Sequence, residues 1–507
     1  MGLTTRDIYL ISPELALVGL ALIVVLADVL LRRRGAVVAI AIAGLAAPLL
    51  LSLVLWDDVH GMAAGAEIGF NGSLVVDKFA LFFKVLIVSA LALVLLASKD
   101  GLVRFRYPAE FIGLVLLSAT GLMLLAAAAD LITIFVALEL ASLPVVALAA
   151  FAKGQARSAE AGLKYLLLSA ISSAVLLYGF AFLYGAAGTV RVVALDPAMP
   201  TIAQMVSTLD PEVPFGSIAL MAGAVLAIAG FGFKLSMVPF QMWTPDVYEG
   251  APLPVGAFLA VASKAAGFAV VLRVFYTALG HDVVSQDWAF LFAVLAAVTM
   301  SVGNLVAIAQ ANLKRLLGYS TIAQAGYMLI GVAAIAARSQ ESGDASLGAA
   351  SVLFYLGGYA AMTLTTFFVI IVVTDRTGDE RIAGLAGLGQ RSPWLAGVLA
   401  LALLSLTGLP PTVGFMGKLF LFQAAVNADL VWLAVIGVVN SVVSAYYYVN
   451  VIKTMYLRPA ETKEDARVAV SATSTAALGV TGAGVLVLGL WPGGLLEVAR
   501  TAVAILI

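Results

Sequence analysis

The sequence contains no cysteine, and its 507 residues include only two histidines, His60 and His281. The absence of cysteine excludes disulfides, thiolate zinc sites and cysteine-ligated iron–sulfur clusters within this chain. Charged residues are also scarce, at 11%, whereas a soluble protein averages about 25%. The net charge of −1 gives no support for nucleic-acid binding. Because both histidines fall in predicted loops, a proton route through the chain must use lysine, glutamate, tyrosine and hydroxyl side chains together with water.

Apolar residues dominate what is present: they make up 63% of the chain, and the mean hydropathy is +1.08. A helix needs about 20 apolar residues to cross the hydrocarbon core of a bilayer. By that measure the sequence predicts an all-α polytopic integral membrane protein with fourteen spans. They are 10–31, 36–56, 74–97, 108–128, 130–150, 159–186, 216–241, 254–279, 287–309, 314–337, 346–374, 393–425, 431–457 and 468–491.

The loop charges predict an orientation for these spans. If Arg32–Arg34 lie in the cytoplasm, the alternation of spans places nearly all other loop lysines and arginines there too. The opposite side receives only Arg6, Arg191, Arg338 and Arg500. Basic residues concentrate in cytoplasmic loops of membrane proteins, so both termini are expected on the outer side.

Two of the predicted spans contain helix-breaking residues beside a lysine. The stretch GFGFKLSMVPFQMWTPDVYEGAPLPVGAFLAVASK places Lys234 before a break near Pro239 and Lys264 in the next span. Residues 404–422, LSLTGLPPTVGFMGKLFLF, repeat the arrangement with Pro410–Pro411 followed by Lys418. Proline removes a backbone donor and opens a helix. Open backbone at membrane depth is tolerated only when it is buried in protein or lines water.

Paired interruptions of this kind are typical of transporters built from repeats. We therefore expect two inverted five-helix repeats, each with one broken helix, because an odd number of spans reverses the direction of the second copy. The predicted division is an N-terminal three-helix segment at 1–107, a first repeat at 108–279 and a second repeat at 280–457. Residues 458–507 form a cytoplasmic loop and a final span.

Charged residues inside the spans are the candidate site. A lysine within a membrane helix is costly, and burial disfavours its charged form, so it can exchange a proton. The alternative is that each lysine forms a static pair with a hidden carboxylate or extends to an interface. The candidates are Lys234, Lys264, Lys418, Glu139 and Lys164, and Glu139 is expected to pair with Lys234 or Lys164.

Other polar groups allow several interpretations. Lys84 is expected to extend outward and Arg273 to anchor at an interface. The tyrosines of the run 446–448 are interpreted as packing and interface residues. Asp246 and Glu249 fit a subunit contact, a helix cap or a proton-uptake funnel, and the sequence does not choose among these.

Three motifs resemble a known family. VPFQMWTPDVYEGAPLPVGAF (238–258), GNLVAIAQANLKRLLGYSTIAQAGYMLIG (303–331) and TGLPPTVGFMGKLFLF are similar to the antiporter-like membrane subunits of respiratory complex I. The resemblance covers essentially the whole chain. Within the family, PDVYEGAP followed by PVGAFLAVASKAAGF is most similar to the N-type subunits of bacterial NADH:quinone oxidoreductase.

The resemblance implies a proton-translocating subunit of the bacterial inner membrane, with periplasmic termini and other membrane-arm subunits as partners. Electron transfer from NADH to quinone, with FMN and iron–sulfur clusters, would belong to those partners, and this chain would hold no cofactor. Glu139, Lys234, Lys264 and Lys418 match the family's proton pathway, and Lys164 matches an additional basic residue.

Gln241 and Gln324 stand where related subunits often carry histidine, so a titrating imidazole is not expected at either position. One alternative is a subunit of a related cation/proton antiporter or of a membrane-bound hydrogenase complex. Another is a membrane spacer whose lysines are silent.

Overall fold

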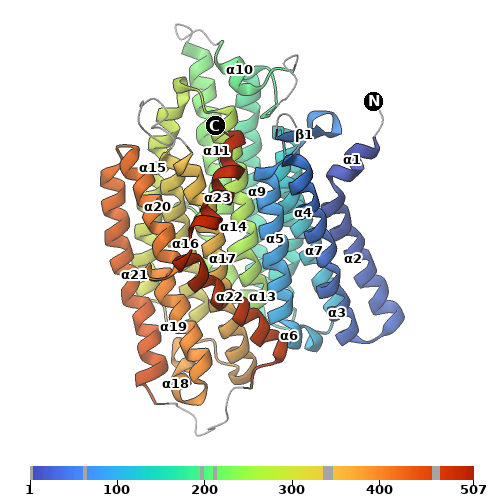
Figure 1. The fold of residues 1–507 in the computed structure, drawn as a ribbon, viewed down its shortest axis with the longest axis vertical. Coiled ribbons are helices and arrows are strands. Elements are labelled where there is room, and N and C mark those ends of the chain that lie inside the picture. Colours follow the sequence, from blue (N-terminus) through green and yellow to red (C-terminus); the bar gives the residue numbers. More distant parts are fainter. Residues whose placement is uncertain are drawn as a thin grey trace.

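The computed structural model describes residues 4–60, 65–193, 199–208, 214–334, 346–459 and 469–506. These residues form a bundle of long, roughly parallel helices, and both termini lie at the same end of it (Figure 1). That placement agrees with an even number of crossings. The end opposite the termini carries α6 (Lys99–Arg104) and α18 (Leu388–Arg391). The predicted cytoplasmic loop at 458–467 falls largely on 460–468, outside the described residues.

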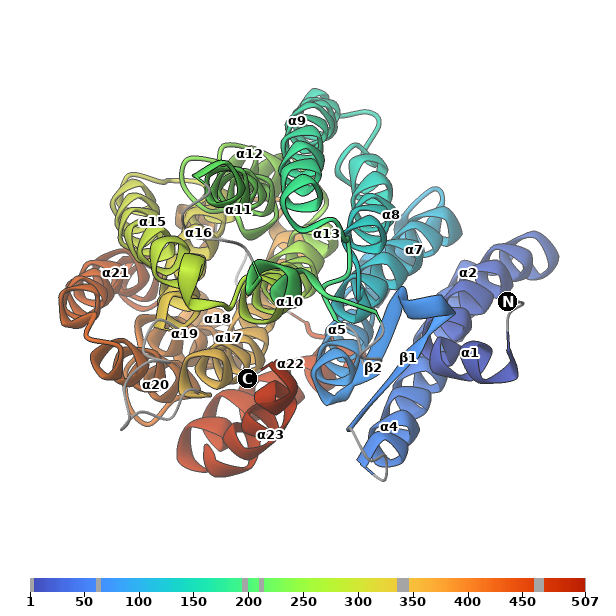
Figure 2. The same ribbon diagram turned by 90° about the horizontal axis from the view of Figure 1, so that it is seen from above.

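The N-terminal segment forms one edge of the bundle when it is viewed along the helices (Figure 2). A short antiparallel hairpin pairs Ala66 with Asp77 and leads directly into α5, whose first turn is capped by the Asp77 carboxylate. The elements are α1 (Thr5–Leu10), α2 (Ser12–Leu31), α3 (Arg34–Gly44), α4 (Ala46–His60), β1 (Ala66–Gly69), β2 (Leu74–Asp77) and α5 (Lys78–Ala97).

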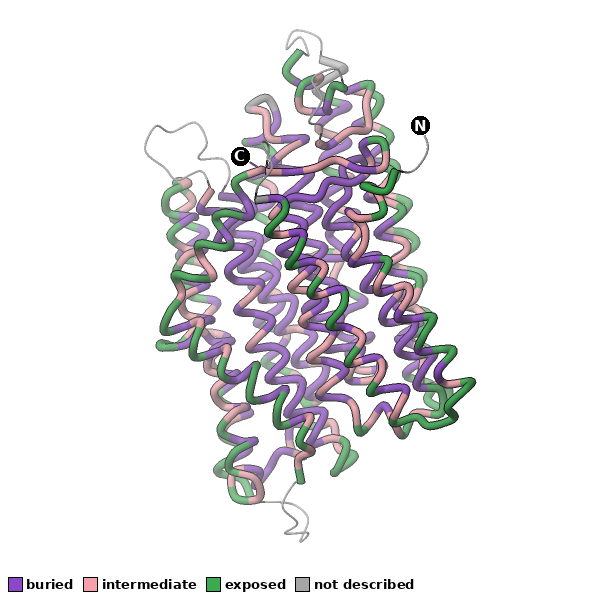
Figure 3. The backbone as a smooth tube through the Cα atoms, turned by 45° about the vertical axis from the view of Figure 1, so that its right-hand side comes forward, coloured by how far each residue is buried: buried purple, intermediate pink, exposed green. Residues whose placement is uncertain are grey.

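The next helices along the chain carry the first predicted break. They are α7 (Pro108–Ala127), α8 (Leu131–Ala149), α9 (Ala156–Ala187), α10 (Ile202–Val206), α11 (Pro214–Leu235), α12 (Trp243–Gly250), α13 (Leu253–Phe258) and α14 (Lys264–Arg273). Two π-helical segments, η2 (Leu259–Ser263) and η3 (Val274–Ala278), flank α14. All residues from Leu253 to Ala278 are buried except Pro254 and Thr277, so this span has no lipid-facing side (Figure 3).

The remaining helices complete the far side of the bundle. They are α15 (Asp282–Ile308), α16 (Leu313–Ala333), α17 (Leu347–Thr377), α19 (Pro393–Thr407), α20 (Val413–Asn427), α21 (Val431–Leu457), α22 (Ala472–Leu490) and α23 (Gly493–Val503). The sequence did not predict α23, which packs against α5 and α17.

The predicted spans are confirmed. Within the described residues, thirteen helical segments are long and apolar enough to cross a membrane, with α3 and α4 counted as one segment. The two shorter apolar helices, α19 and α20, together occupy the predicted broken span at 393–425. The chain is therefore an all-α multi-pass membrane protein in which the hairpin is a small addition.

The two halves of the chain share local features in the same order. Asp130 caps α8 and Asn312 caps α16, each by accepting two backbone N–H groups. The following long helices, α9 and α17, end at Gly188 and Gly378, which both have φ of +68°. Three residues later, Arg191 and Arg381 form isolated β-bridges with Asp130 and Asn312.

Small residues let the paired helices approach closely in both halves. A Cβ atom at Gly121 of α7 would lie 2.4 Å from the Ala141 backbone of α8. At Gly303 of α15 it would lie 2.6 Å from the Ala323 backbone of α16. Close backbone contact through glycine is a common way for membrane helices to associate.

Two buried ion pairs hold the N-terminal segment in place and correct two expectations. Lys84 does not extend outward: its side chain is 1% exposed, and its Nζ lies 2.8 Å from Glu14 Oε1 of α2. Arg273 is not an interfacial anchor, because both its terminal nitrogens donate to the Asp77 carboxylate, at 2.8 and 2.9 Å. The sequence could not show these partners, since 196 residues separate Arg273 from Asp77.

Candidate functional site

Both predicted helix breaks are present, and they have the same local geometry. Helix α11 ends at Leu235, and the next residue, Ser236, has φ of +60°. Helix α19 ends at Thr407, and the next residue, Gly408, has φ of +93°. The last carbonyls of a helix lack intrahelical donors and carry partial negative charge. Each break therefore exposes acceptors inside the protein.

A lysine from another helix reaches each of these ends. Lys264 of α14 donates to the Leu235 carbonyl at 3.1 Å and to the Thr321 carbonyl of α16 at 2.9 Å. Lys418 of α20 donates to the carbonyls of Thr407 at 2.9 Å and Leu406 at 3.3 Å. The sequence placed Lys234 beside the first break, but the lysine that meets the exposed carbonyl is Lys264.

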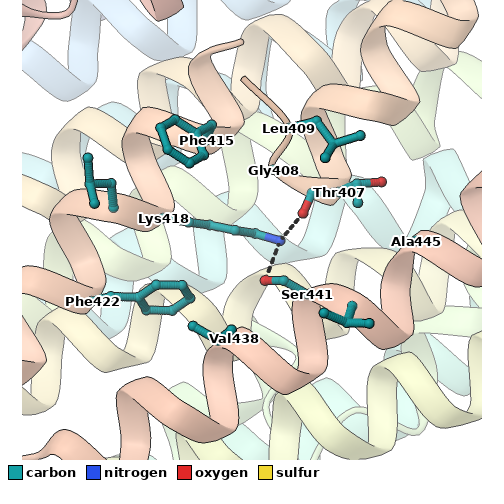
Figure 4. A pocket seen from close by; sticks show the side chains of 11 residues that line it. Thr407, Gly408, Leu409, Phe415, Lys418, Phe422, Val438, Ser441 and Ala445 are labelled. Atoms are coloured by element: carbon teal, nitrogen blue, oxygen red, sulfur yellow. Dashed lines mark hydrogen bonds between the residues drawn. The ribbon is translucent and has the colours of Figure 1, made fainter. Parts of the chain in front are cut away.

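Lys418 points from α20 toward the end of α19 and toward α21 (Figure 4). Its Nζ also donates to the Ser441 hydroxyl at 3.0 Å and lies 4.1 Å from the centroid of the Tyr327 ring. The cavity beside it has a volume of about 350 Å³. The lining is mostly apolar and includes exposed Val442, so the cavity reaches the outer surface of the chain.

Lys234 lies beside α8. Its Nζ donates to the Ser142 hydroxyl at 3.1 Å. Glu139, one turn earlier on α8, accepts a hydrogen bond from Ser173 of α9. No Glu139 oxygen lies within 4.0 Å of Lys234 Nζ among the ion pairs of the described residues. Glu139 and Lys234 therefore belong to one region without forming a direct ion pair.

Gln324 links the two breaks. Its Nε2 donates to the Leu406 carbonyl at 3.1 Å, and this carbonyl also accepts from Lys418. On the same helix, one turn earlier, Thr321 supplies the carbonyl that Lys264 contacts. A glutamine cannot carry a proton as an imidazolium, but here it joins the surroundings of Lys264 to those of Lys418.

The buried lysines fall into two groups according to their partners. Lys84 has a carboxylate within 4.0 Å. In the part of the chain that the structure describes, the ion pairs include none for Lys234, Lys264 or Lys418, although all three are at most 3% exposed. Their contacts are hydroxyls, carbonyls and an aromatic ring. A buried charge without a compensating charge is costly, so these three side chains are suited to exist in both protonation states.

Lys164 does not contact Glu139. Its Nζ lies 2.6 Å from Asp246 of α12 and 2.5 Å from Glu160, and its side chain is 40% exposed. Arg315, at the start of α16, pairs with Asp246 at 2.6 Å and with Glu249 at 3.0 Å. Glu160, Asp246, Glu249 and Arg315 line a small cavity of about 110 Å³. The network connects α9, α12 and α16.

Asp246 is the centre of this network. Burial alone would raise the pKa of its carboxyl, but hydrogen bonds from Lys164 and Arg315 outweigh that effect and hold the pKa below its usual value. Asp246 is thus ionised at neutral pH and clamps the half-helix α12 to its neighbours. An internal clamp was not among the uses that the sequence left open, which were a subunit contact, a helix cap and a proton-uptake funnel.

No group of three or more histidine, cysteine, aspartate or glutamate side chains that could hold a metal gathers within the described ranges. Gln241, the other glutamine that the sequence analysis singled out, lies in the turn between α11 and α12. Its Oε1 is buried without a hydrogen-bond partner.

Comparison with known proteins agrees with this arrangement. A family profile described as NADH:quinone oxidoreductase/Mrp antiporter, TM, matches residues 128–444. A relative from Dehalococcoides mccartyi, NADH-quinone oxidoreductase subunit N, is 41% identical over 501 residues, which is 98% of this chain and 99% of the relative.

Solved structures are also similar to this chain. A chain of respiratory complex I from Thermus thermophilus with bound aureothin is 34% identical, with a TM-score of 0.76 over 96% of this chain and 98% of that chain. A chain of the membrane-bound sulfane sulfur reductase, an archaeal respiratory membrane complex, has a TM-score of 0.83 at 23% identity, covering 97% and 98%. The second likeness concerns the fold alone.

Proposed function

The chain belongs to the family of NADH-quinone oxidoreductase subunit N, and from this premise we propose that its buried lysines carry protons across the membrane. It is an antiporter-like subunit of the proton-pumping membrane arm of complex I. The observation that supports the relay is that Lys234, Lys264 and Lys418 are buried and, within the described residues, contact hydroxyls, carbonyls and an aromatic ring and form no ion pair.

The proposed route follows the contacts. Lys234 receives a proton near Glu139, and the negative charge of that carboxylate favours its ammonium form. Lys264 comes next, because it contacts the carbonyl of Leu235, the neighbour of Lys234 in the chain. From Lys264 the route then passes along α16, from the Thr321 carbonyl to the Gln324 side chain, and reaches Lys418. At each step an ammonium loses one proton to water or a hydroxyl, and a neutral amine gains one.

Lys164 takes a different part in this proposal. It lies in the Asp246 network and not beside Glu139, so we assign it to the uptake side. Opening and closing of the network around α12 would then control access to Lys234. The end that carries α6 and α18 would face the cytoplasm, and both termini would face the periplasm.

The wider assembly is also part of the proposal. Redox chemistry with FMN, iron–sulfur clusters and quinone belongs to partner subunits, and this chain contacts other membrane-arm subunits in a bacterial inner membrane. We divide the chain at 1–107, 108–279, 280–457 and 458–507, with the two middle parts as inverted repeats. The matching caps, left-handed glycines and breaks of the two halves support that division.

Two alternatives are less well supported. The first is a subunit of a related cation/proton antiporter or of a membrane-bound hydrogenase complex, and against it stands the full-length identity of 41% to subunit N. A silent spacer would keep its lysines in ion pairs. That description fits Lys84 but not the three relay lysines.

The test uses inside-out vesicles that contain the assembled complex. Lys264→Ala and Lys418→Ala should each strongly reduce proton pumping per NADH oxidised, because each removes a titratable site. Lys84→Arg is the matched control: it keeps a buried cation next to Glu14, so pumping should stay at the wild-type level. Normal pumping by both alanine variants at normal assembly would exclude the relay.

A further inference from the structure

The two halves of the relay differ in how they compensate a buried ammonium. In the first half, Lys234 shares its region with the carboxylate of Glu139. In the second half, the sequence places every acidic residue near a helix end or in a connecting segment. In the described part of this half, these residues are Asp282, Asp287, Asp375, Asp379, Glu380 and Asp429. Lys418 forms no ion pair with any described carboxylate, so another group must stabilise its charge.

The geometry points to Tyr327 as that group: we propose that the face of its ring takes the place of a counter-ion for Lys418. Lys418 Nζ lies 4.1 Å from the ring centroid, within the range of about 6 Å over which a cation is attracted to an aromatic face. Tyr327 is fully buried, and desolvation strengthens such an attraction. This inference rests on the proposed relay and adds a positioning residue to it.

The ring is held in place by its own hydroxyl group. Asn304 of α15 donates to the Tyr327 oxygen at 3.3 Å, and the Ser441 hydroxyl lies 3.5 Å from it. Asn304 is fixed in turn by Asn440 at 3.1 Å and by the Tyr447 hydroxyl at 3.0 Å. The sequence interpreted the run 446–448 as packing, but Tyr447 belongs to this polar network.

Beyond the backbone carbonyls and the Ser441 hydroxyl that Lys418 contacts, the described titratable side chains of the neighbouring helices do not provide a second candidate. Among the helices packed against α20, α19 and α22 carry no titratable side chain. Helix α17 brings Tyr355, whose hydroxyl bonds to Gln324, and Tyr359, whose hydroxyl meets Thr321. Helix α21 brings Tyr447, together with Tyr448, which bonds to Ser320. None of these rings is positioned over the ammonium among the cation–π contacts of the described residues.

A series of ring substitutions in the whole complex tests the proposal. Tyr327→Phe, 4-fluorophenylalanine and 3,4,5-trifluorophenylalanine at position 327 have nearly the same size, but the attraction of the ring face for a cation falls as fluorine is added. Tyr327→Leu removes the ring. We measure proton pumping in inside-out vesicles as a function of pH and normalise it to NADH oxidation, which also reports assembly.

If the ring stabilises the ammonium, its loss lets Lys418 release its proton more easily, and the alkaline limit of pumping moves to lower pH. Tyr327→Phe lacks the hydroxyl that holds the ring, so it serves as the reference for the series. Relative to it we expect a stepwise shift with each fluorinated ring, and about one pH unit for Tyr327→Leu. A purely structural role would give a flat fluorine series, and that result would overturn the proposal.

Lys418→Ala separates the inference from the proposed function. If this variant stops pumping while the fluorine series is flat, the relay stands and the role of the ring fails. If Lys418→Ala pumps normally, the relay step at Lys418 is wrong and the inference fails with it. A graded series together with a non-pumping Lys418→Ala supports both.

Discussion

The ammonium group of Lys264 lies 3.1 Å from the carbonyl oxygen of Leu235, the last residue of α11. The contact joins an interrupted helix to a lysine of the most deeply buried span, and the other half repeats it between Lys418 and Thr407. In each case a half-helix end, with its partial negative charge, stabilises an ammonium that has no carboxylate partner. A helix end attracts an ammonium less strongly than a full counter-charge does. The lysine can therefore hold its proton there and also release it.

The first prediction concerns the Ser142 hydroxyl that Lys234 contacts. Ser142→Ala removes the bond to Lys234 Nζ, and hydrogen bonds to charged groups contribute about 1.5–3 kcal/mol. We expect pumping to fall by roughly tenfold or more if this bond is used during transfer. Ser118→Ala is the control, since Ser118 is also buried against α8 but bonds to the Ala141 carbonyl. Equal effects of the two substitutions would contradict a specific role for Ser142.

The second prediction concerns the packing of the second break. A Cβ atom at Gly414 would lie 1.7 Å from the Ser405 carbonyl oxygen, a backbone atom that cannot move aside easily. Gly414→Ala should destabilise the chain by at least about 1–3 kcal/mol and reduce the yield of assembled complex. Gly397→Ala on α19 meets nothing within 4 Å and should be neutral or slightly stabilising. Thermal unfolding of the purified complexes compares them, and a normal Gly414→Ala variant would contradict the observed packing.

The third prediction concerns pH and the network around α12. The pKa of Asp246 is held low in the folded chain by Lys164 and Arg315, so its ionised form contributes stability at pH values above the unfolded pKa of about 3.9. That contribution is lost as the pH falls through the lower folded pKa. Asp246→Asn should therefore lower the melting temperature at neutral pH, and its difference from wild type should shrink below about pH 4.

Glu160→Gln provides the control for this network. Glu160 also pairs with Lys164, but its side chain is 59% exposed, and exposed ion pairs contribute little. Its melting temperature should stay close to wild type throughout the pH range. A difference between Asp246→Asn and wild type that grows on acidification would contradict the assigned ionisation of Asp246.

Much of the fold could be predicted from the sequence, because long apolar runs and loop charges are local signals. The broken spans followed from prolines and glycines near Lys234 and Lys418, and the candidate residues stood out as charges in apolar surroundings. These signals depend on neighbours in the chain and need no knowledge of packing.

The partners of those residues could not be predicted, because they come from distant helices. Lys164 meets Asp246, 82 residues away, and Lys264 meets Thr321, 57 residues away. The sequence around the break suggested that Lys234 meets the end of α11. Lys264 meets it instead, because α14 packs against α11 at that point. The ring of Tyr327 beside Lys418 also arises only when α16 and α20 pack together.

The most direct test of the relay is the stoichiometry of proton pumping by the Lys234→Arg complex. Arginine keeps the positive charge but cannot readily release a proton, so it separates proton transfer from a static electrostatic role. Inside-out vesicles with equal amounts of assembled complex report protons pumped per NADH oxidised. The relay predicts a clear fall in this ratio for Lys234→Arg as well as for Lys234→Ala, whereas a wild-type ratio for Lys234→Arg would remove Lys234 from the proton pathway.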